Sequence, residues 1–563
     1  MAQNENTPPE KVSLTIDGHE VSVPKGTTVL QAAESIGIRV PHYCYHPELS
    51  APAMCRVCLV EIEGAPKLQP SCVAQVAEGQ VVHTESEGAL KMRKGVFEFY
   101  LQNHPLDCPI CDRSGECKFQ DYVNAEGPDK GRSREPKRVF GRDDFGGDIL
   151  FYGDRCVMCT RCVRFMNEVD EKPLLTVVER GDRSIIDTFF DTGLSESAFA
   201  GNIVDICPVG ALVSKDFLHK ARAWDLDHTP SVCPNCSQGC NISIHSRDNL
   251  VQRLKPRANM DVNSHWMCDY GRLNYEWINE GDRLEVPLVR TAPSGDGSST
   301  GGAASTDEPV ATRRGMKATG WSGTLEQLSR QLLGLGDGAA SGGMMAVASP
   351  YASNEELGAL AELVAELGGG EGDLLYRSVR AENEDVLAGF PTLARRRELA
   401  PNGRGAELLG FTRVGDDAGQ GGLDAVRAAK GIVFVLGDDL VDQDEAFGEN
   451  AALYVYLGTH RPLAAEAAHY VLPTTTFAEQ EGSFTNIQGR VQRFWPALLA
   501  PGAARPAWLV LGALLAARHG REIPTQAAQL FASVAARTPA FSGLSYESIG
   551  TRGAIVNEPV ALR

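Results

Sequence analysis

The placement of cysteine constrains this chain more than any other feature of its sequence. The 563 residues contain 15 cysteines, and all of them lie between Cys44 and Cys268. An odd and clustered set of cysteines, in a chain without an evident export signal, is a poor basis for a disulfide framework. Close pairs and triplets of cysteine favour metal ligation instead. We therefore expect metal sites that are concentrated in the first half of the molecule.

Charge and hydropathy argue against two broad classes of function. The formal net charge is -19, so nucleic acid, which needs a basic surface, is not expected as a partner. No apolar stretch reaches the roughly 20 residues of a membrane helix, and the nearest one, 507–517, predicts a short buried helix. The N-terminus lacks the pattern of a secretory signal peptide, so we expect no export.

The first cysteine set follows a segment with the pattern of a small β-rich domain. Residues 12–23 alternate apolar and polar side chains around Asp17-Gly18, which predicts a hairpin, and 28–36 predict a short helix. One close cysteine pair with long gaps on both sides favours a [2Fe-2S] cluster, with a four-cysteine zinc site as the alternative. The set consists of Cys44, Cys55, Cys58 and Cys72.

The second set needs a ligand that is not cysteine. Cys108, Cys111 and Cys117 are too few for a four-ligand site, and the other cysteines divide into complete sets of four. A lone histidine is more often structural than a ligand. Because the site lacks a fourth ligand, we nevertheless favour His104 for that position. It is the nearest histidine and lies at the end of a helix predicted over 86–104.

The third and fourth sets each combine three close cysteines with one distant cysteine. This arrangement is typical of a [4Fe-4S] cluster, whereas zinc sites more usually combine two close pairs. Zinc remains the alternative for the fourth set. The third set is Cys156, Cys159, Cys162 and Cys207, and the fourth is Cys233, Cys236, Cys240 and Cys268.

Together the four sets use every cysteine and one histidine, which leaves no thiol for nucleophilic catalysis. Several clusters in one chain have an obvious use in moving electrons one at a time. We therefore expect an electron relay without catalytic residues of its own. A structural zinc protein is the alternative from a different class, and it would contain little iron, against about 14 iron atoms per chain for the relay.

The second half of the chain has a different pattern. Residues 291–318 are rich in Gly, Ser, Ala and Thr and predict a flexible linker or a long surface loop. Beyond them, apolar runs at 344–347 and 431–436 alternate with helical segments such as 354–367, which favours a parallel α/β sheet. No phosphate-binding loop pattern is present, and we assign no nucleotide site.

Long segments of this sequence resemble known families. Residues 1–282 closely resemble the large iron-sulfur subunits of respiratory complex I, the NADH-quinone oxidoreductase. The segments that carry this resemblance are CRVCLVEIEGAPK (55–67), HPLDCPICDRSGEC (104–117), CVMCTRCVRFMNEV (156–169) and GNIVDICPVGAL (201–212). In addition, CPNCSQGC (233–240) and YVLPTTTFAEQEGSFTNIQGRVQ (470–492) resemble the molybdopterin oxidoreductase superfamily.

The resemblance implies a multidomain fold of the α+β and α/β classes. The implied domains are a [2Fe-2S] ferredoxin-like β-grasp domain (1–85), a [4Fe-4S] domain with one histidine and three cysteine ligands (86–147), a [4Fe-4S] ferredoxin-like domain (148–225), a [4Fe-4S] domain of the molybdopterin-oxidoreductase type (226–290), the linker (291–318), and a shortened, degenerate molybdopterin-oxidoreductase-like domain (319–563).

It also implies a function. Chains of this kind relay electrons in the peripheral arm of proton-pumping NADH:quinone oxidoreductase, from a partner subunit that carries FMN and oxidises NADH towards quinone. The implied cofactors are one [2Fe-2S] cluster and three [4Fe-4S] clusters. The implied location is the cytoplasmic face of the bacterial inner membrane, held there by other peripheral-arm and membrane-arm subunits. The alternative is a relay subunit of a soluble NAD-linked hydrogenase or formate dehydrogenase.

Two positions depart from the related families. Molybdopterin enzymes usually carry a lysine two residues after the last cluster cysteine, where this chain has Tyr270. No cysteine remains to bind molybdenum, so we expect no molybdopterin. Before Cys55 the chain has Ala53-Met54, where complex I subunits commonly have glycine.

Overall fold

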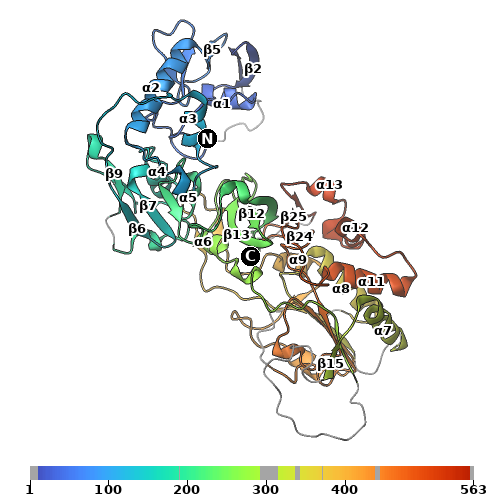
Figure 1. Ribbon diagram of the computed structural model, residues 1–563. Helices are drawn as coiled ribbons and strands as arrows, with labels where there is room; N and C mark the ends of the chain where they lie inside the picture. Colours follow the sequence, from blue (N-terminus) through green and yellow to red (C-terminus); the bar gives the residue numbers. More distant parts are fainter. Residues whose placement is uncertain are drawn as a thin grey trace. The chain divides into compact units, whose positions relative to one another are not determined.

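The computed structural model describes residues 10–188, 191–291, 315–335, 343–370, 372–437 and 444–557 (Figure 1). The chain divides into two compact units. The N-terminal unit runs to Leu226 and includes Leu387–Pro391, and the C-terminal unit contains the other residues from Asp227 onward. This division falls one residue beyond the border at 225/226 that separates the third and fourth expected domains.

A mixed sheet opens the N-terminal unit, with strand order β2-β1-β5-β3-β4. The predicted hairpin is confirmed: β1 (Lys11–Ile16) pairs antiparallel with β2 (His19–Pro24). The predicted helix is α1 (Val29–Ser35), and Thr28 and Gln31 form a capping box at its start. β5 (Val81–His83) lies parallel to β1 and completes the predicted β-grasp arrangement with β3 (Leu59–Ile62) and β4 (Gln69–Pro70).

Short elements separated by long loops form the rest of this unit. The predicted helix over 86–104 is α2 (Glu87–Asn103), capped by Ser86. The other helices are α3 (Lys118–Glu126), α4 (Arg161–Glu168) and α5 (Asn202–Ile206). The strands form a three-stranded sheet, β10 (Leu212–Ser214), β7 (Ile149–Tyr152) and β6 (Arg142–Gly146), and a pair, β8 (Thr176–Val178) and β9 (Ile185–Asp187). β6 lies in a polar segment, and the stacking of Phe145 on Phe151 at 4.7 Å anchors it.

An eight-stranded sheet forms the core of the C-terminal unit. Its central strands are parallel, as predicted, and every residue of β21 and β22 is buried, which is typical of a parallel sheet covered on both faces. In spatial order the strands are β15 (Met316–Ala318), β14 (Leu288–Arg290), β23 (Tyr470–Pro473), β22 (Leu453–Gly458), β21 (Ile432–Leu436), β16 (Met344–Ala348), β17 (Leu374–Tyr376) and β20 (Thr412–Arg413).

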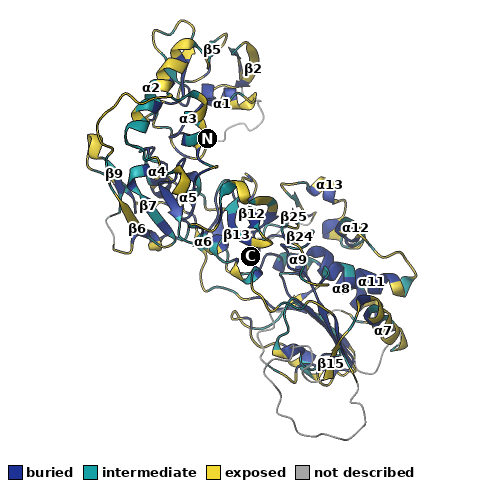
Figure 2. Cartoon of the chain, viewed as in Figure 1, coloured by how far each residue is buried: buried dark blue, intermediate teal, exposed yellow. Residues whose placement is uncertain are grey.

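Helices cover this sheet. The predicted buried helix at 507–517 is α11 (Ala507–His519), which is mostly buried (Figure 2). It ends at Gly520, which is left-handed. α11 and α12 (Ala527–Arg537) both pack against α8 (Asn354–Glu366). The other helices are α6 (Asp269–Leu273), α7 (Trp321–Gly334), α9 (Gly403–Leu408), α10 (Asp424–Ala428) and α13 (Tyr546–Ile549). Among the described residues, no helix combines the length and apolar character needed to cross a membrane.

Smaller sheets complete this unit. β11 (Asp227–Val232), β12 (Asn241–Arg247) and β13 (Leu250–Pro256) form an antiparallel meander around the fourth cysteine set. A second antiparallel sheet consists of β24 (Gly482–Thr485), β25 (Arg490–Phe494) and β26 (Ala554–Ile555). A two-stranded ribbon pairs β18 (Asp385–Val386) with β19 (Ala394–Arg395).

The segment predicted as a flexible linker or a long surface loop, 291–318, has flanks that belong to one sheet. β14 pairs antiparallel with β15, so Leu288 lies opposite Ala318. Residues 292–314 lie outside the described residues. The segment therefore connects two neighbouring strands of the C-terminal unit, a pairing that its Gly- and Ser-rich composition did not reveal.

A buried carboxyl group joins the helices of the C-terminal unit to β24. Glu355, in the first turn of α8, is fully buried. Its Oε1 accepts hydrogen bonds from the hydroxyls of Ser483 (2.7 Å) and Tyr546 (2.9 Å), and its Oε2 accepts one from the backbone N–H of Ser483 (2.9 Å). Burial raises the pKa of Glu355 to about 7, although these hydrogen bonds oppose the shift.

We expect Tyr546→Phe to destabilise the C-terminal unit more at pH 8 than at pH 5. The folded-state pKa of Glu355 lies above its ordinary value of 4.5, so its ionisation weakens the folded state as pH rises from about 4.5 to about 7. The hydrogen bond lost at pH 8 is one to a charged group, about 1.5–3 kcal/mol, against about 1 kcal/mol at pH 5. Urea unfolding of the full chain at each pH, with limited proteolysis as the readout, measures the loss of stability at both pH values.

Tyr376→Phe is the matched control. The hydroxyl of Tyr376 donates to Glu407 at 3.2 Å, and Glu407 lies at the surface of the same unit. We expect this variant to lose the same small amount of stability at both pH values. An equal loss at both pH values for Tyr546→Phe would contradict the role of Glu355.

Candidate metal centres

The first cysteine set converges in the loops between α1 and β5. Its four thiol groups are buried. Cys44 forms sulfur hydrogen bonds with Cys55 and Cys72, and Cys58 forms one with Cys72. These contacts lower the pKa values of Cys44 and Cys58, while they raise those of Cys55 and Cys72. The four side chains therefore form one connected group.

The loop around this set contains left-handed residues. Ala53 has a φ of 53° and Arg56 a φ of 56°. A left-handed conformation costs a residue with a side chain about 1–2 kcal/mol, and glycine much less. This explains why a glycine suits the segment where this chain has Ala53-Met54. The hydroxyl of Tyr100 donates to the carbonyl of Cys55 at 3.2 Å and ties the loop to α2.

The second set lies between α2 and α3. His104 follows the last residue of α2, Cys111 and Cys117 are buried, and Cys108 is exposed. The His104 ring packs on Phe119, with centroids 4.5 Å apart, and burial, reinforced by Arg155, lowers the pKa of His104 to about 4. The imidazole is therefore neutral at pH 7, the form in which histidine binds metal. Its Nδ1 is buried and has no hydrogen-bond partner among the described residues.

The third set combines a tight turn with the end of α5. Met158 and Thr160, between the first three cysteines, are left-handed, with φ of 48° and 58°. The backbone N–H of Met158 donates to Cys156 Sγ at 3.3 Å. Cys207 follows the last residue of α5 and returns to this turn, because α5 and α4 pack together.

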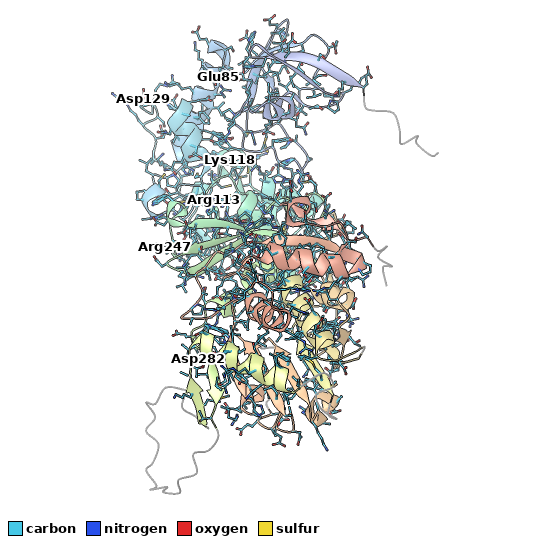
Figure 3. All side chains as sticks on the ribbon, turned by 90° about the vertical axis from the view of Figure 1, so that its right-hand side faces the viewer. Glu85, Arg113, Lys118, Asp129, Arg247 and Asp282 are labelled. Carbon is cyan, nitrogen blue, oxygen red and sulfur yellow. The ribbon has the colours of Figure 1, made fainter. Side chains whose placement is uncertain are left out.

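The loops of the second and third sets are in direct contact. Gly210 lies three residues after Cys207, and a Cβ atom at this position would lie 2.3 Å from Cys111 Sγ. Arg113, labelled in Figure 3, donates from Nη2 to the carbonyls of Cys207 at 2.7 Å and Asp205 at 3.0 Å. The position of each set therefore depends on the other.

The fourth set lies in the C-terminal unit, and its four cysteines are all buried. The backbone N–H of Cys233 donates to the carbonyl of Cys240 at 2.8 Å and closes the loop. Cys268 precedes α6, and its Sγ accepts a hydrogen bond from the backbone N–H of Gly271 at 3.3 Å. A Cβ atom at Gly271 would lie 3.1 Å from Cys233 Sγ, so this glycine allows the close approach of the two segments.

Residues far along the chain hold the loop of the fourth set. The backbone N–H of Ser237 donates to the carbonyl of Glu398 at 2.9 Å, and its carbonyl accepts from Ile487 at 2.8 Å. The Gln492 side chain donates to the carbonyl of Gly239 at 2.9 Å. No local sequence pattern predicts these supporting residues, although Ile487 and Gln492 lie in the segment 470–492 that carries the superfamily resemblance.

A cavity of about 370 Å³ lies at the carboxyl ends of the parallel strands. This is where α/β sheets commonly bind ligands. Ser349 follows β16, Gly437 follows β21 and Thr474 follows β23, and all three line it. The buried Glu356 also lines the cavity, whereas none of the described lining residues is Lys or Arg.

The predicted ligands fit iron-sulfur clusters in their chemistry. Each set offers thiol groups, joined in the second set by a neutral imidazole, on irregular loops whose backbone N–H groups reach sulfur. Among the described residues, no group of three or more His, Cys, Asp or Glu side chains is arranged for a single metal ion. The assignment of the sixteen ligands therefore stays a prediction.

Five family models match successive parts of the chain. Family models match a 2Fe-2S iron-sulfur cluster binding domain (9–87), the NADH-ubiquinone oxidoreductase-G iron-sulfur binding region (93–132), the ferredoxin-like domain of NADH-quinone oxidoreductase subunit 3 (146–213), the molybdopterin oxidoreductase Fe4S4 domain (226–280) and molybdopterin oxidoreductase (380–517).

A relative from Candida albicans, the mitochondrial NADH-ubiquinone oxidoreductase 78 kDa subunit, is 31% identical over 90% of this chain and 82% of its own length. The chain belongs to the family of large iron-sulfur subunits of NADH-quinone oxidoreductase. A relative from Rickettsia bellii, also a subunit of NADH-quinone oxidoreductase, is 42% identical over 50% of this chain and 41% of its own length. The chain thus matches about two fifths of the length of that relative. Among solved structures, an NAD+-reducing [NiFe]-hydrogenase covers 37% of this chain and 90% of its own, at 30% identity and a TM-score of 0.34.

We expect Gly210→Ala to disrupt the second set of this iron-sulfur subunit. The added methyl group would lie 2.3 Å from Cys111 Sγ and 3.1 Å from the Cβ of Arg113, so Cys111 must move. Anaerobically purified protein should lose about four iron atoms per chain, the content of one [4Fe-4S] cluster. Iron analysis and EPR spectra of the reduced protein measure this loss.

Gly95→Ala is the control for Gly210→Ala. Gly95 lies in α2, and a Cβ atom there would contact nothing within 4 Å. Alanine also favours helix by about 1 kcal/mol over glycine. We expect full iron content in this variant, and full iron content in Gly210→Ala as well would show that Cys111 is not a ligand.

Proposed function

We propose that this chain is the electron-transfer subunit of the peripheral arm of proton-pumping NADH:quinone oxidoreductase. It would relay electrons from a partner subunit that carries FMN and oxidises NADH towards quinone. The observation that carries the proposal is the interlocking of three ligand sets in one compact unit of a chain that belongs to this family. The chain itself has no catalytic residues in this proposal.

The relay needs one [2Fe-2S] and three [4Fe-4S] clusters, which would supply sites that each gain or lose one electron. The first set would hold the [2Fe-2S] cluster and the other three sets the [4Fe-4S] clusters. All the cysteines except Cys108 and Cys156 are buried, and this burial excludes water and lowers the local dielectric constant, which affects the potential of a bound cluster. Left-handed residues and close-packed glycines let the loops bend around their sites.

The fourth set and the C-terminal unit have a different role from the first three sets. We do not assign the fourth cluster to the main electron path. Tyr270 stands where molybdopterin enzymes usually carry a lysine, and none of the described residues that line the cavity at the sheet edge is Lys or Arg. The missing lysine disfavours electron relay to a pterin, and the lack of a basic residue in the cavity disfavours the anionic phosphate of a molybdopterin, so we propose that this unit supports the fourth set without a pterin.

The partners in this proposal are the flavin subunit and other peripheral-arm and membrane-arm subunits of complex I. They would hold the chain at the cytoplasmic face of the bacterial inner membrane. The names of the relatives, which are subunits of NADH-quinone or NADH-ubiquinone oxidoreductase, support such an assembly.

The role of His104 can be tested by a change of ligand. We expect His104→Cys to keep about four iron atoms at the second set but to lower the midpoint potential, because a thiolate is anionic where imidazole is neutral. An EPR-monitored redox titration measures this potential. His83→Cys, at a partly exposed histidine paired with Glu63 at 3.0 Å, is the control and should leave it unchanged. An unchanged potential in His104→Cys would remove His104 from the ligand set.

The proposed function is tested by isolating the tagged chain anaerobically from gently solubilised cells and identifying its partners. We expect recovery in the membrane fraction with a flavin subunit and integral-membrane subunits, and about 14 iron atoms per chain with little zinc. Recovery only in the soluble fraction with a hydrogenase or formate dehydrogenase subunit would overturn the complex I assignment. Several zinc ions and almost no iron would overturn the relay itself.

A further inference from the structure

Helix α4 joins the first ligand set to the third. It carries Cys162 of the third set in its first turn, and it also carries Arg161 and Arg164. Residues three positions apart lie on the same side of a helix, so the two arginines are neighbours. Both are buried, with 4% and 9% of their surface exposed.

Arg164 contacts a ligand residue of each set at the same time. Its Nη2 donates to the carbonyl of Cys44, in the first set, at 2.5 Å and to the carbonyl of Cys159, in the third set, at 3.1 Å. Its Nη1 donates to the carbonyl of Ser50, and its Nε to the hydroxyl of Thr160 at 3.3 Å. The planar guanidinium group thus spans the two loops, a geometry that a lysine ammonium group cannot reproduce.

Arg161 makes a second bridge beside the first. Its Nη1 donates to the carbonyl of Ile206, the residue before Cys207, at 3.0 Å, and its Nη2 donates to the carbonyl of Tyr45, the residue after Cys44. Each arginine therefore binds at least one backbone carbonyl at the first set and one at the third. On the same helix, Glu168 accepts hydrogen bonds from the backbone and side chain of Ser50 at 2.8 and 2.5 Å.

The two guanidinium groups bring positive charge into this buried site. Their hydrogen bonds go to neutral carbonyl and hydroxyl oxygens, and no carboxylate of the described residues is paired with either group. A buried charge is costly unless an opposite charge compensates it. The eight thiolates of two loaded clusters would supply that negative charge.

We propose that Arg161 and Arg164 are positioning residues shared by the first and third clusters, which they hold in fixed register and whose reduction potentials they raise together. The inference rests on the proposed function, because it requires clusters at both sets. One electron that passes between the sets oxidises one and reduces the other, without bond formation or proton transfer. Since each arginine contacts both sets, its positive charge stabilises an added electron on either cluster. It therefore does not oppose electron transfer in either direction between them.

The test is an EPR-monitored redox titration of the full chain, purified anaerobically with its clusters. We expect Arg164→Gln to lower the midpoint potentials of both the [2Fe-2S] cluster and the third-set [4Fe-4S] cluster, because reduction adds a negative charge that the guanidinium group stabilises. Arg164→Lys keeps the charge, so both potentials should stay closer to those of the unaltered chain. Because lysine cannot bridge the two carbonyls, both EPR signals should be lost together at a lower temperature on heating.

Arg93→Gln is the matched control. Arg93 is also buried in the same unit, but its Nε pairs with Glu126 at 2.6 Å, a residue that belongs to neither set. We expect it to lower stability without shifting either potential. Unchanged potentials in Arg164→Gln, or a shift of one cluster alone, would overturn the inference.

The lysine variant keeps the test decisive if the glutamine variant does not fold. Signals that survive heating in Arg164→Lys as they do in the unaltered chain would also overturn the inference. Absence of iron and of both EPR signals from the unaltered chain would instead overturn the proposed function, so the two failures are distinct.

Discussion

Hydrogen bonding from buried guanidinium groups to backbone carbonyls holds the N-terminal unit together around its ligand loops. Such loops have few backbone partners of their own, and each unpaired buried carbonyl would be costly. Arg113 supplies donors to the end of α5, while Arg161 and Arg164 supply them to the loops of the first and third sets. Three sites with little secondary structure can therefore occupy fixed positions.

The C-terminal unit solves the same problem with backbone and amide groups. The loop of the fourth set contains Ser237, Gln238 and Gly239, and residues more than 150 positions later bind it. The parallel sheet and the buried Glu355 network position β24 and β25, which carry part of this support. A structural requirement of the fourth set is thus a physical reason to retain a domain that resembles an enzyme but that we propose binds no pterin.

Local sequence patterns predicted many of the helices and strands. The hairpin at 12–23, the helices at 86–104 and 507–517, and the strands at 344–347 and 431–436 depend on periodicity, capping and apolar runs that a short window contains. β6 and the pairing of β14 with β15 were missed. β6 is stabilised by the stacking of Phe145 on Phe151. β14 and β15 pair although 25 residues separate them in the chain, and the composition of those residues does not indicate the pairing.

The sequence alone determined the family resemblance. It also predicted the four ligand sets and the need for a histidine in one of them, because metal ligation requires particular side chains at particular spacings. Only the tertiary structure decided how the sets are supported. The contact of Gly210 with Cys111, the bridges from Arg161 and Arg164, and the role of distant residues around the fourth set join segments far apart in the chain. Such contacts produce no periodic pattern in the sequence, because each one is an isolated contact between groups that only the fold brings together.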